Sequence, residues 1–520
     1  MNKNIFNSVQ LMKPKTNSFD LSHDVKLSLN MGDLVPIMVS ECIPGDRFKI
    51  SCESLLRFAP MVAPIMHRCD VTMHYFFVPN RIIWEGWEKF ITNTKRDETG
   101  QLPAFPFTKA GVPDGGDHEF ARYTKLHDYF GIPKPPDVEG TVENVSALPF
   151  AAYNKIWNEY YRDQNLQEKK FDQLVDGDNS EQLKFTDVYK RAWEHDYFTS
   201  ALPFAQKGAA VEIPISGTIE FEPDAGANPK FLNAGTGNQM AGGDQTIKSG
   251  FLGVSYGDPS TNPAGYDPDG TLVVNNADTT INDLRRAFRL QEWLEKAARG
   301  GSRYIENILM HFGVRSSDKR LQRPEYITGV KSPVVISEVL NTTGTVDAPQ
   351  GNMSGHGVSV VSGNYGNYYC EEHGYIIGIM SVMPKTAYMQ GIPKHFLKTT
   401  DPFQYYWPSF ANIGEQEILN KELYAWTGDS GNNTFGYTPR YAEYKYEQNR
   451  VAGDFRDTLD FWHMARKFAS APALNSAFIS ADPTHRIFAV EDPEEQKIWA
   501  HVYNKVTAIR PMPKFGTPML

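Results

Sequence analysis

The chain has 520 residues, of which 41% are hydrophobic and 22% are charged, and its formal net charge is −10. This length predicts either two or more domains or one domain with large insertions. The negative charge argues against a strongly basic nucleic-acid binder, although a local basic face is compatible with that total. With 25 Tyr, 31 Phe and 9 Trp the chain is rich in aromatic residues, and its 34 Pro and 41 Gly predict many loops.

The N-terminal stretch MNKNIFNSVQLMKPKTNSF has no signal-peptide pattern. No segment approaches the roughly 18 apolar residues of a membrane span, so we expect no membrane insertion. The four cysteines contain no CxxC pair and are too few for a disulfide scaffold, which predicts buried thiols. They are Cys42, Cys52, Cys69 and Cys370.

Residues 1–90 predict an N-terminal arm followed by the first β-strands. Three segments have the composition of strands, and Pro or Gly lies near their ends. They are LVPIMVSECI (34–43), RFKISCESLLRF (47–58) and RCDVTMHYFFVP (68–79). In the third, Val71, Met73, Tyr75 and Phe77 alternate with Thr72, His74 and Phe76.

Residues 91–207 predict a connection of loops and helices without sheet. Within it, AYNKIWNEYYRDQNL (152–166) places Tyr153, Trp157, Tyr160 and Tyr161 on one face of an amphipathic helix. Tyr and Trp each have a large apolar body and a polar tip, which suits a core helix of the chain's own domain or a contact with another chain. The residues on the other side of the helix are Asn154, Lys155, Asn158, Glu159, Arg162 and Asp163.

Two short motifs resemble sites but have simpler interpretations. In WEHDYF, Glu194, His195 and Asp196 are adjacent, so their side chains point in different directions and do not converge for proton transfer; a solvated loop is the favoured interpretation. In CEEHG, Cys370 and His373 have a metal-like spacing but no second ligand pair nearby, which favours a strand edge.

Residues 208–223 (GAAVEIPISGTIEFEP) predict a strand, and residues 224–280 form a Gly-, Asn- and Asp-rich surface insertion. The insertion contains few large apolar residues, so it cannot bury a core of its own. GTGNQMAGG (235–243) lacks the strand, helix and GK[ST] context of a phosphate loop and predicts an exposed tip. The tip residues are Gly235, Gly237, Asn238, Gly242 and Gly243.

Residues 281–330 predict a helical connection, with two helices separated by the glycine pair at 300–301. Residues 331–520 predict further strands and a C-terminal arm. In total about eight dispersed strands are expected, which favours antiparallel sheets with Greek-key or jelly-roll connections over regular βαβ units.

Both chain ends combine basic residues with aromatic neighbours, a composition found at single-stranded nucleic-acid contacts. Solvated tails of no specific function are the alternative. The basic residues are Lys3, Lys13, Lys15, Lys505, Arg510 and Lys514.

No GxSxG or HExxH motif occurs, and the sequence identifies no catalytic, cofactor-binding or metal-binding residue. Their absence from a long chain lowers the expectation of an enzyme, and we expect no cofactor.

Four long segments, however, resemble the major capsid protein of the microviruses (Microviridae), small single-stranded DNA bacteriophages, and especially the gokushovirus branch. The resemblance covers nearly the whole chain. The segments are 152–166, WEHDYFTSALPFAQKG (193–208), LRRAFRLQEWLEKAARGGSRYIENILMHFGV (284–314) and LQRPEYITG (321–329).

The resemblance implies a mainly β fold, an eight-stranded antiparallel jelly roll with long loop insertions containing several helices. It also implies sixty copies in a T=1 icosahedral capsid, no enzymatic activity, and a virion assembled in the bacterial host cytoplasm. Residues 224–280 would form a protrusion on the three-fold axes for host attachment. The implied partners are the single-stranded DNA genome, a small basic DNA-associated protein, a DNA pilot protein, an internal scaffolding protein and a host-cell surface receptor.

A carbohydrate-binding or carbohydrate-cleaving β-sandwich is the alternative function. It predicts a monomer or small oligomer with an open cleft and perturbed acids, whereas a capsid protein predicts a closed assembly.

Overall fold

The computed structural model divides into two compact units, Met1–Ala205 with Ala298–Leu520, and Gln206–Ala297. It describes residues 15–515 except 94–100, 113–125, 134–140, 184–187, 212–216, 222–229, 234–263, 268–271, 277–279, 341–352, 427, 491 and 493–494.

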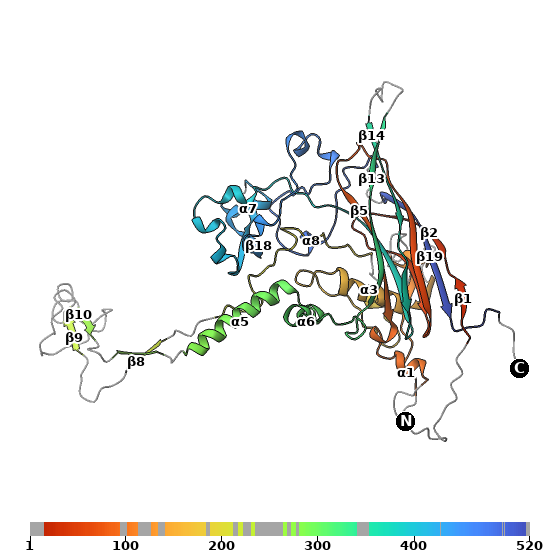
Figure 1. Cartoon of the computed structure of the whole chain (residues 1–520), viewed down its shortest axis with the longest axis horizontal. Coiled ribbons are helices and arrows are strands. Elements are labelled where there is room, and N and C mark those ends of the chain that lie inside the picture. The colour runs from red at the N-terminus through yellow and green to blue at the C-terminus, as the bar shows by residue number, and fades with distance from the viewer. Residues whose placement is uncertain are drawn as a thin grey trace, which may run out of the picture. The chain divides into compact units, whose positions relative to one another are not determined.

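The larger unit is built on two antiparallel β-sheets, of which the first has seven strands within the described residues. Its order is β1-β19-β4-β14-β13, with β2 also paired to β19 and β15 to β4 (Figure 1). Asn17 of β1 pairs with Arg510 of β19, so segments from opposite ends of the chain lie side by side. The strands are β1 (Asn17–Asp20), β2 (His23–Leu29), β4 (Arg47–Phe58), β13 (Val335–Leu340), β14 (Met353–Ser362), β15 (Gly366–Tyr369) and β19 (Ile498–Arg510).

The second sheet has the order β12-β5-β16-β3. Its central strands pair from Gly374 opposite Pro79 to Pro384 opposite Cys69. Nearly every residue of these two strands is buried, which requires that both faces of the sheet be covered. The strands are β3 (Val35–Cys42), β5 (Cys69–Pro79), β12 (Glu325–Pro333) and β16 (Gly374–Pro384).

The largest hydrophobic core lies between the two sheets and takes side chains from both. Along β4 and β19, buried residues alternate with residues that are mostly exposed, as expected for strands with one face in a core. Tyr75 of β5 donates a hydrogen bond to Asn504 of β19 (2.8 Å), and Asn504 donates to the carbonyl of Ile37 (2.8 Å). This satisfied polar network helps to fix how the sheets pack together.

These features confirm a mainly β chain with antiparallel sheets and helix-containing connections. The prediction that residues 91–207 contain no sheet is wrong, because β6 (Phe107–Val112) pairs with β7 (Thr141–Ser146). The helices before residue 205 are η2 (Asn80–Ile82), α1 (Trp87–Ile91), α2 (Leu126–Tyr129), α3 (Leu148–Ile156), the π-helix η4 (Trp157–Tyr161) and α4 (Ser180–Leu183).

A lobe of short elements follows β16 and spans residues 393–446. It contains η5 (Lys394–Leu397), η6 (Pro402–Gln404), η7 (Pro408–Phe410), β17 (Glu415–Leu419), α7 (Asn420–Leu423), η8 (Gly428–Asn432), β18 (Thr434–Pro439) and η9 (Ala442–Tyr444), with β17 paired to β18. Beyond it lie η10 (Gly453–Arg456), η11 (Asp460–Trp462) and α8 (Ser476–Ile479).

The smaller unit contains two antiparallel strand pairs that are nested along the sequence. β8 (Gly217–Phe221) pairs with β11 (Leu272–Asn276), and β9 (Lys230–Asn233) pairs with β10 (Ala264–Asp267). β8 lies within the predicted strand 208–223, and its partner belongs to the insertion. Alternating polarity identifies a strand but not the strand with which it pairs.

The prediction of two helices in residues 281–314 is confirmed by α5 (Ile281–Gly300) and α6 (Tyr304–Phe312). The glycine pair has two separate roles. A Cβ on Gly300 would lie only 1.9 Å from the sulfur of Met310, and Gly301 has φ +97°, where side chains are disfavoured.

Candidate functional site

The predicted aromatic helix is α3 continued by η4, and it packs onto the chain's own four-stranded sheet. Tyr153, Trp157 and Tyr161 are buried and Tyr160 is half-buried. The helix forms a second hydrophobic core with side chains of β5 and β16 on the outer face of that sheet. Of the two expected placements, core helix or contact with another chain, the structure places these residues in the first.

The polar tips of these aromatic side chains bind neighbouring segments of the chain. The Tyr153 hydroxyl donates to the carbonyl of Leu34 (2.8 Å), and the Trp157 indole donates to the carbonyl of Lys190 (3.3 Å). The Tyr160 hydroxyl donates to the carbonyl of Pro324 (2.6 Å). Each ring therefore contributes apolar area and also fastens a connecting segment.

The polar side of the predicted helix is also largely buried, although an amphipathic pattern normally exposes that side. The chain folds back over it, so that the amide of Asn154 donates to the carbonyl of Phe171 (2.7 Å). Lys155 forms an ion pair with Asp172 (3.3 Å), and Asn158 also donates to Asp172 (3.1 Å). Local periodicity does not reveal such a covering segment.

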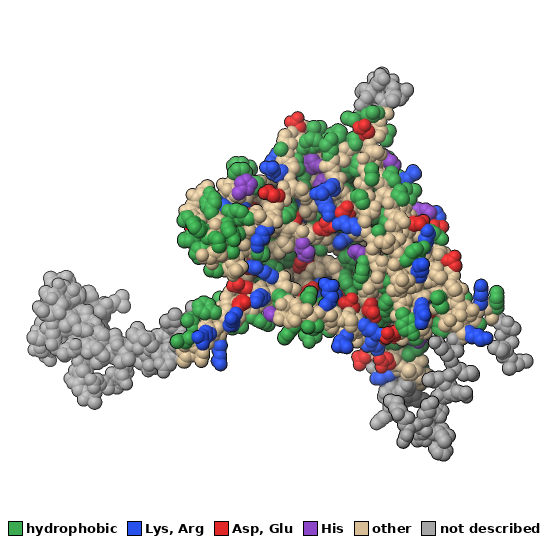
Figure 2. Space-filling view, in the orientation of Figure 1, with side chains coloured by type: hydrophobic (Ala, Val, Ile, Leu, Met, Phe, Trp, Pro, Cys, Tyr) green, Lys and Arg blue, Asp and Glu red, His purple; other side chains and the backbone are tan. Residues whose placement is uncertain are grey.

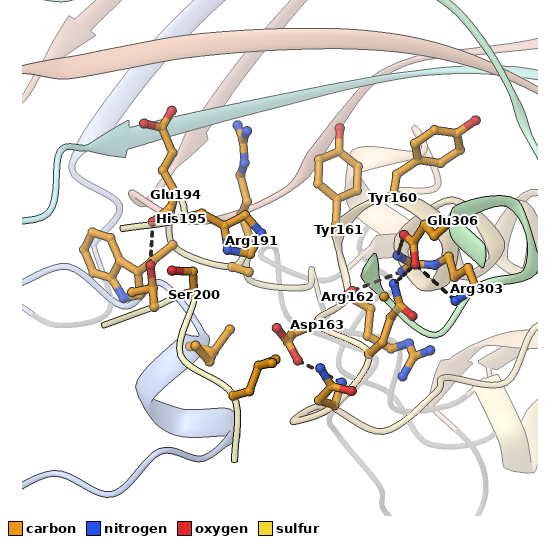
Figure 3. Close-up of a pocket in the computed structure, with 18 of the residues that line it drawn as sticks. Tyr160, Tyr161, Arg162, Asp163, Arg191, Glu194, His195, Ser200, Arg303 and Glu306 are labelled. Atoms are coloured by element: carbon orange, nitrogen blue, oxygen red, sulfur yellow. Dashed lines mark hydrogen bonds and ion pairs between the residues drawn. The ribbon is translucent and has the colours of Figure 1, made fainter. Parts of the chain in front are cut away.

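A cavity of about 730 Å³ lies beside this helix. Its walls come from β5, η4, residues 191–202 and the turn between α5 and α6, and Figure 3 shows the charged side chains gathered around it. Glu306 accepts hydrogen bonds from Arg303 (3.2 Å) and Gln164 (2.7 Å). Arg191 donates to the hydroxyls of Thr72 (2.7 Å) and Ser381 (3.1 Å). These charged side chains therefore hydrogen-bond to the segments that form the cavity walls.

His74 is a partly buried titratable group that lines this cavity. Its Nδ1 lies 2.8 Å from the Tyr161 hydroxyl. Burial lowers the pKa of His74 to about 4, and the nearby Arg191 guanidinium adds to this effect. A neutral imidazole bound to a buried tyrosine supports packing rather than proton transfer at neutral pH.

The solvated-loop prediction for WEHDYF is wrong, because most of this segment is buried. Asp196 accepts hydrogen bonds from the backbone of Thr199 (2.8 Å) and from the Tyr388 hydroxyl (2.8 Å). Glu194 instead pairs with Lys331 (2.7 Å) and Lys385. Partial burial tends to raise the pKa of Glu194, but these two lysines outweigh it and lower the pKa to about 2. The two acids therefore bind separate partners and form no acid/base pair.

The residues of CEEHG also have separate structural partners. Cys370 is buried, and the His373 ring lies 5.6 Å from the Trp87 ring. Among the described residues, no three His, Cys, Asp or Glu side chains are placed to hold a metal ion. All four cysteines are buried and free, which confirms the prediction of buried thiols.

The basic residues predicted as arms lie in different environments. Lys3 and Lys13 are outside the described residues, while Lys15 and Lys514 are exposed. Lys505 lies within β19 beside Glu53, and Arg510 lies 3.4 Å from buried Asp46, so these two belong to the sheet rather than to a tail. The predicted tip residues Gly235, Gly237, Asn238, Gly242 and Gly243 all lie outside the described residues.

A further feature is an exposed aromatic surface on the lobe of residues 393–446, which we call the aromatic lobe. Figure 2 shows hydrophobic side chains gathered over this part of the molecule. Apolar patches of this kind mark contact surfaces, and protein interfaces are enriched in Tyr, Trp and Phe. The exposed aromatic residues are Phe396, Phe403, Tyr405, Tyr406, Trp407, Trp426 and Tyr444.

Our sequence interpretation did not single out the aromatic lobe. The available signal was PFQYYWPSF (402–410), which has four aromatic residues between two prolines and a fifth after them, with no strand or helix periodicity. Such a segment supplies large apolar area without a pattern that would bury it in the chain's own core.

No helix of the described residues is long and apolar enough to cross a membrane.

Comparisons with known proteins agree on one family. The model of the "Capsid protein (F protein)" family of phages matches residues 7–520. Capsid protein VP1 of Chlamydia phage 1 is 36% identical over 100% of this chain and 98% of its own length. Capsid protein VP1 of Bdellovibrio phage phiMH2K is 35% identical over 99% and 98%, respectively. Capsid protein VP1 of Spiroplasma virus 4 is 32% identical over 96% and 94%. This chain therefore belongs to the phage capsid protein (F protein) family, whose members are structural proteins rather than enzymes.

Proposed function

We propose that sixty copies of this chain close a T=1 icosahedral shell around a single-stranded DNA genome. Family membership supports self-assembly into a capsid and a place in the virion. The aromatic lobe carries the proposal on the structural side, because a lone chain would leave its seven aromatic side chains in water. We assign a second copy of the chain as the partner that covers it.

The strand order supports a jelly roll as the building block. The eight strands β2, β3, β4, β5, β12, β14, β16 and β19 divide between two sheets as 2-19-4-14 and 3-16-5-12. The chain changes sheet at every step through these eight strands except from β5 to β12. This interleaving produces the paired Greek keys of a jelly roll, a fold used by viral capsids. The remaining strands would then extend the first sheet.

Host attachment is assigned to the insertion of residues 224–280. β8, just before the insertion, pairs with β11 near the end of the insertion, so the segments on either side of residues 222–271 lie side by side. A Gly-rich excursion gains burial if three copies meet at a three-fold axis. Deleting residues 234–263 should leave shell assembly intact and abolish attachment to the host receptor. Loss of assembly by a folded chain would contradict this assignment.

The charge of the chain bears on how the genome is neutralised. Sixty chains of net charge −10 would carry about −600 and could not neutralise a packaged genome as a whole. Another source of positive charge must do so, and we propose the small basic DNA-associated protein that the family resemblance implies. The same resemblance supplies the DNA pilot protein and the internal scaffolding protein of the proposed set. Assembly would take place in the bacterial host cytoplasm.

Sedimentation of the chain co-expressed with these partners, followed by negative-stain microscopy, tests the proposal. We expect uniform shells about 240 Å across, the size at which sixty compact 520-residue units cover a sphere. The variant Tyr406→Ser with Trp407→Ser should remain a folded monomer. The control, Tyr365→Ser with Tyr369→Ser, removes two comparably exposed aromatic rings outside the lobe and should still assemble. The proposed shell would be refuted if the unmodified chain formed only monomers when all the partners were present.

A further inference from the structure

Trp426 of the aromatic lobe is 93% exposed, more than any other large hydrophobic side chain among the described residues. Its backbone φ is +62°, in the left-handed region that bulky side chains rarely adopt. The preceding residue, Ala425, is buried, and its N–H donates to the carbonyl of Gln390 (2.8 Å). The indole therefore projects into solvent from a well-anchored base. A strained residue with an exposed ring points to a binding role, since neither feature stabilises the isolated chain.

A pocket of about 350 Å³ lies elsewhere on the larger unit. Three chain segments form it, residues 66–68, 385–387 and 449–463, and we call it the Arg68 pocket. Its volume falls in the range of about 300 to 1,000 Å³ that is typical of small-ligand sites, so it has room for an indole ring. Its apolar lining residues are Met66, Ala387, Val451, Ala452 and Phe455.

Hydrogen bonds between these segments hold the Arg68 pocket in shape. The side-chain amide of Asn449 donates to the carbonyl of Thr386 (2.7 Å). The Nε2 atom of His67 lies 2.6 Å from the carbonyl of Lys385. Burial lowers the pKa of His67 to about 4, so the ring that makes this contact is neutral at neutral pH. A pocket that is formed in advance binds its occupant at a smaller cost in conformational entropy.

The rim of the pocket is basic. Arg68 and Arg450 are exposed, line the pocket and form no ion pair with any described residue. No acidic side chain is among its described lining residues. A guanidinium group is attracted to the face of an indole ring and to nearby negative charge. The loop that carries Trp426, residues 426–433 (WTGDSGNN), has one acidic residue and no basic residue, so it matches the pocket in charge as well as in its ring.

Trp426 is not among the residues that line the pocket of its own chain, but every further copy of the chain presents the same ring. Copies in a closed assembly meet through complementary surfaces, and Trp side chains held in pockets are typical anchors of such contacts. Family membership supports self-assembly, which favours a second copy over an unrelated partner as the occupant.

We propose that Trp426 of one copy inserts into the Arg68 pocket of a neighbouring copy, where its indole packs on Met66 and Phe455 beside the two guanidinium groups. This inference rests on the proposed function, since it names the anchor and the receiving pocket for the contact that the aromatic lobe makes. The other exposed rings of the lobe would surround the anchor and exclude water.

Cross-linking tests the contact while Trp426 stays in place. Chains with Ser430→Cys, on the Trp426 loop, are co-expressed with chains carrying Ala452→Cys, on the pocket rim, together with the assembly partners. A short bismaleimide then joins nearby thiols, and the four native cysteines are buried and do not compete. We expect cross-linked dimers with one chain of each kind, identified by mass spectrometry. Adding Trp426→Ala to the first chain should abolish them, and Lys89→Cys in place of Ser430→Cys should give none.

Assembly gives a second measurement. Trp426→Ala should raise the concentration of chain left unassembled at least about tenfold in sedimentation, because a central anchor is lost. Ala452→Trp fills the pocket from its exposed rim and should have a similar effect. Combining the two should add little, since both remove the same contact. The matched controls, Trp499→Ala and Ala473→Trp, change exposed positions elsewhere and should assemble normally. Urea unfolding checks that each variant is folded.

Three results would each overturn the inference: no mixed cross-link, normal assembly by Trp426→Ala, or equal assembly by Ala452→Trp and Ala473→Trp. The cross-link is scored in both the shell fraction and the soluble fraction, so it decides the contact whether or not shells form. Shells without the cross-link would leave the proposed function standing without this anchor. Cross-linked dimers without shells would support the contact and contradict the proposed shell.

Discussion

The outer faces of the two sheets of this capsid protein differ in polarity and in whether other elements cover them. The outer face of the four-stranded sheet is apolar and covered by α3 and η4, which add a second hydrophobic core to that side. The outer face of the seven-stranded sheet carries cations, polar groups and half-exposed rings, and no described element covers it. The same central core is therefore flanked by one sheet whose outer face is buried within the chain and by another whose outer face is open in the described structure.

The difference is visible in the strands themselves. β5 and β16 are buried almost throughout, because a helix lies on one face and the central core on the other. In β4 and β19, buried residues largely alternate with residues that point outward, and the outward residues contribute little to the core. A substitution should therefore have a very different cost on the two outer faces.

Introducing a charge should give the largest contrast. Ile377 on the covered face is 0% exposed, and Val360 on the open face is 72% exposed. Ile377→Lys should reduce the free energy of unfolding by about 5 kcal/mol, because an unpaired ammonium group is buried. Val360→Lys should change it by less than about 0.5 kcal/mol. Urea unfolding of the unassembled chain measures both. Similar costs at the two positions would remove the distinction between the faces.

Removing a tryptophan should give the next largest effect. Trp157 on the covered side is 4% exposed and Trp499 on the open side is 48% exposed. Trp157→Ala should cost about 3 to 5 kcal/mol, since it leaves a cavity and an unpaired Lys190 carbonyl. Trp499→Ala should cost about 1 kcal/mol or less. Urea unfolding measures both costs. A Trp157→Ala variant as stable as the Trp499→Ala variant would contradict the burial of Trp157 in the second core.

Lowering the pH should reduce the free energy of unfolding through His74, which lies on the covered side. Its pKa is about 4 in the folded chain, below its ordinary value of 6.5, so the unfolded chain takes up the proton first as pH falls. The stability from the neutral ring is complete above pH 6.5 and declines between pH 6.5 and 4, by up to about 3 kcal/mol. His74→Gln should flatten this part of the stability profile measured by urea unfolding at each pH. An unchanged slope would exclude His74 as the cause.

Neutralising the open face should have the smallest effect on stability. Arg47 and Lys49 form no ion pair with a described residue, so Arg47→Gln with Lys49→Gln should change the free energy of unfolding by less than about 0.5 kcal/mol. A loss of 2 kcal/mol or more would show that these cations stabilise the sheet.

The sequence by itself determined the features that depend on local pattern. Residues 47–58 were identified as a strand, and the glycine pair at 300–301 separated the two helices as the structure has them. The four buried thiols followed from cysteine number and spacing. The resemblance of long segments such as 284–314 to a known capsid protein also indicated the family.

Only the tertiary structure decided which surfaces meet. The polar side of the 152–166 helix is buried because residues 167–172 fold over it. The pairing of β8 with β11 could not be predicted from local pattern, because the two strands lie more than fifty residues apart in sequence. The same holds for Glu194, which meets Lys331 and Lys385 rather than its neighbour Asp196. Periodicity reports the direction of each side chain from its own backbone, whereas long-range packing decides what lies in that direction.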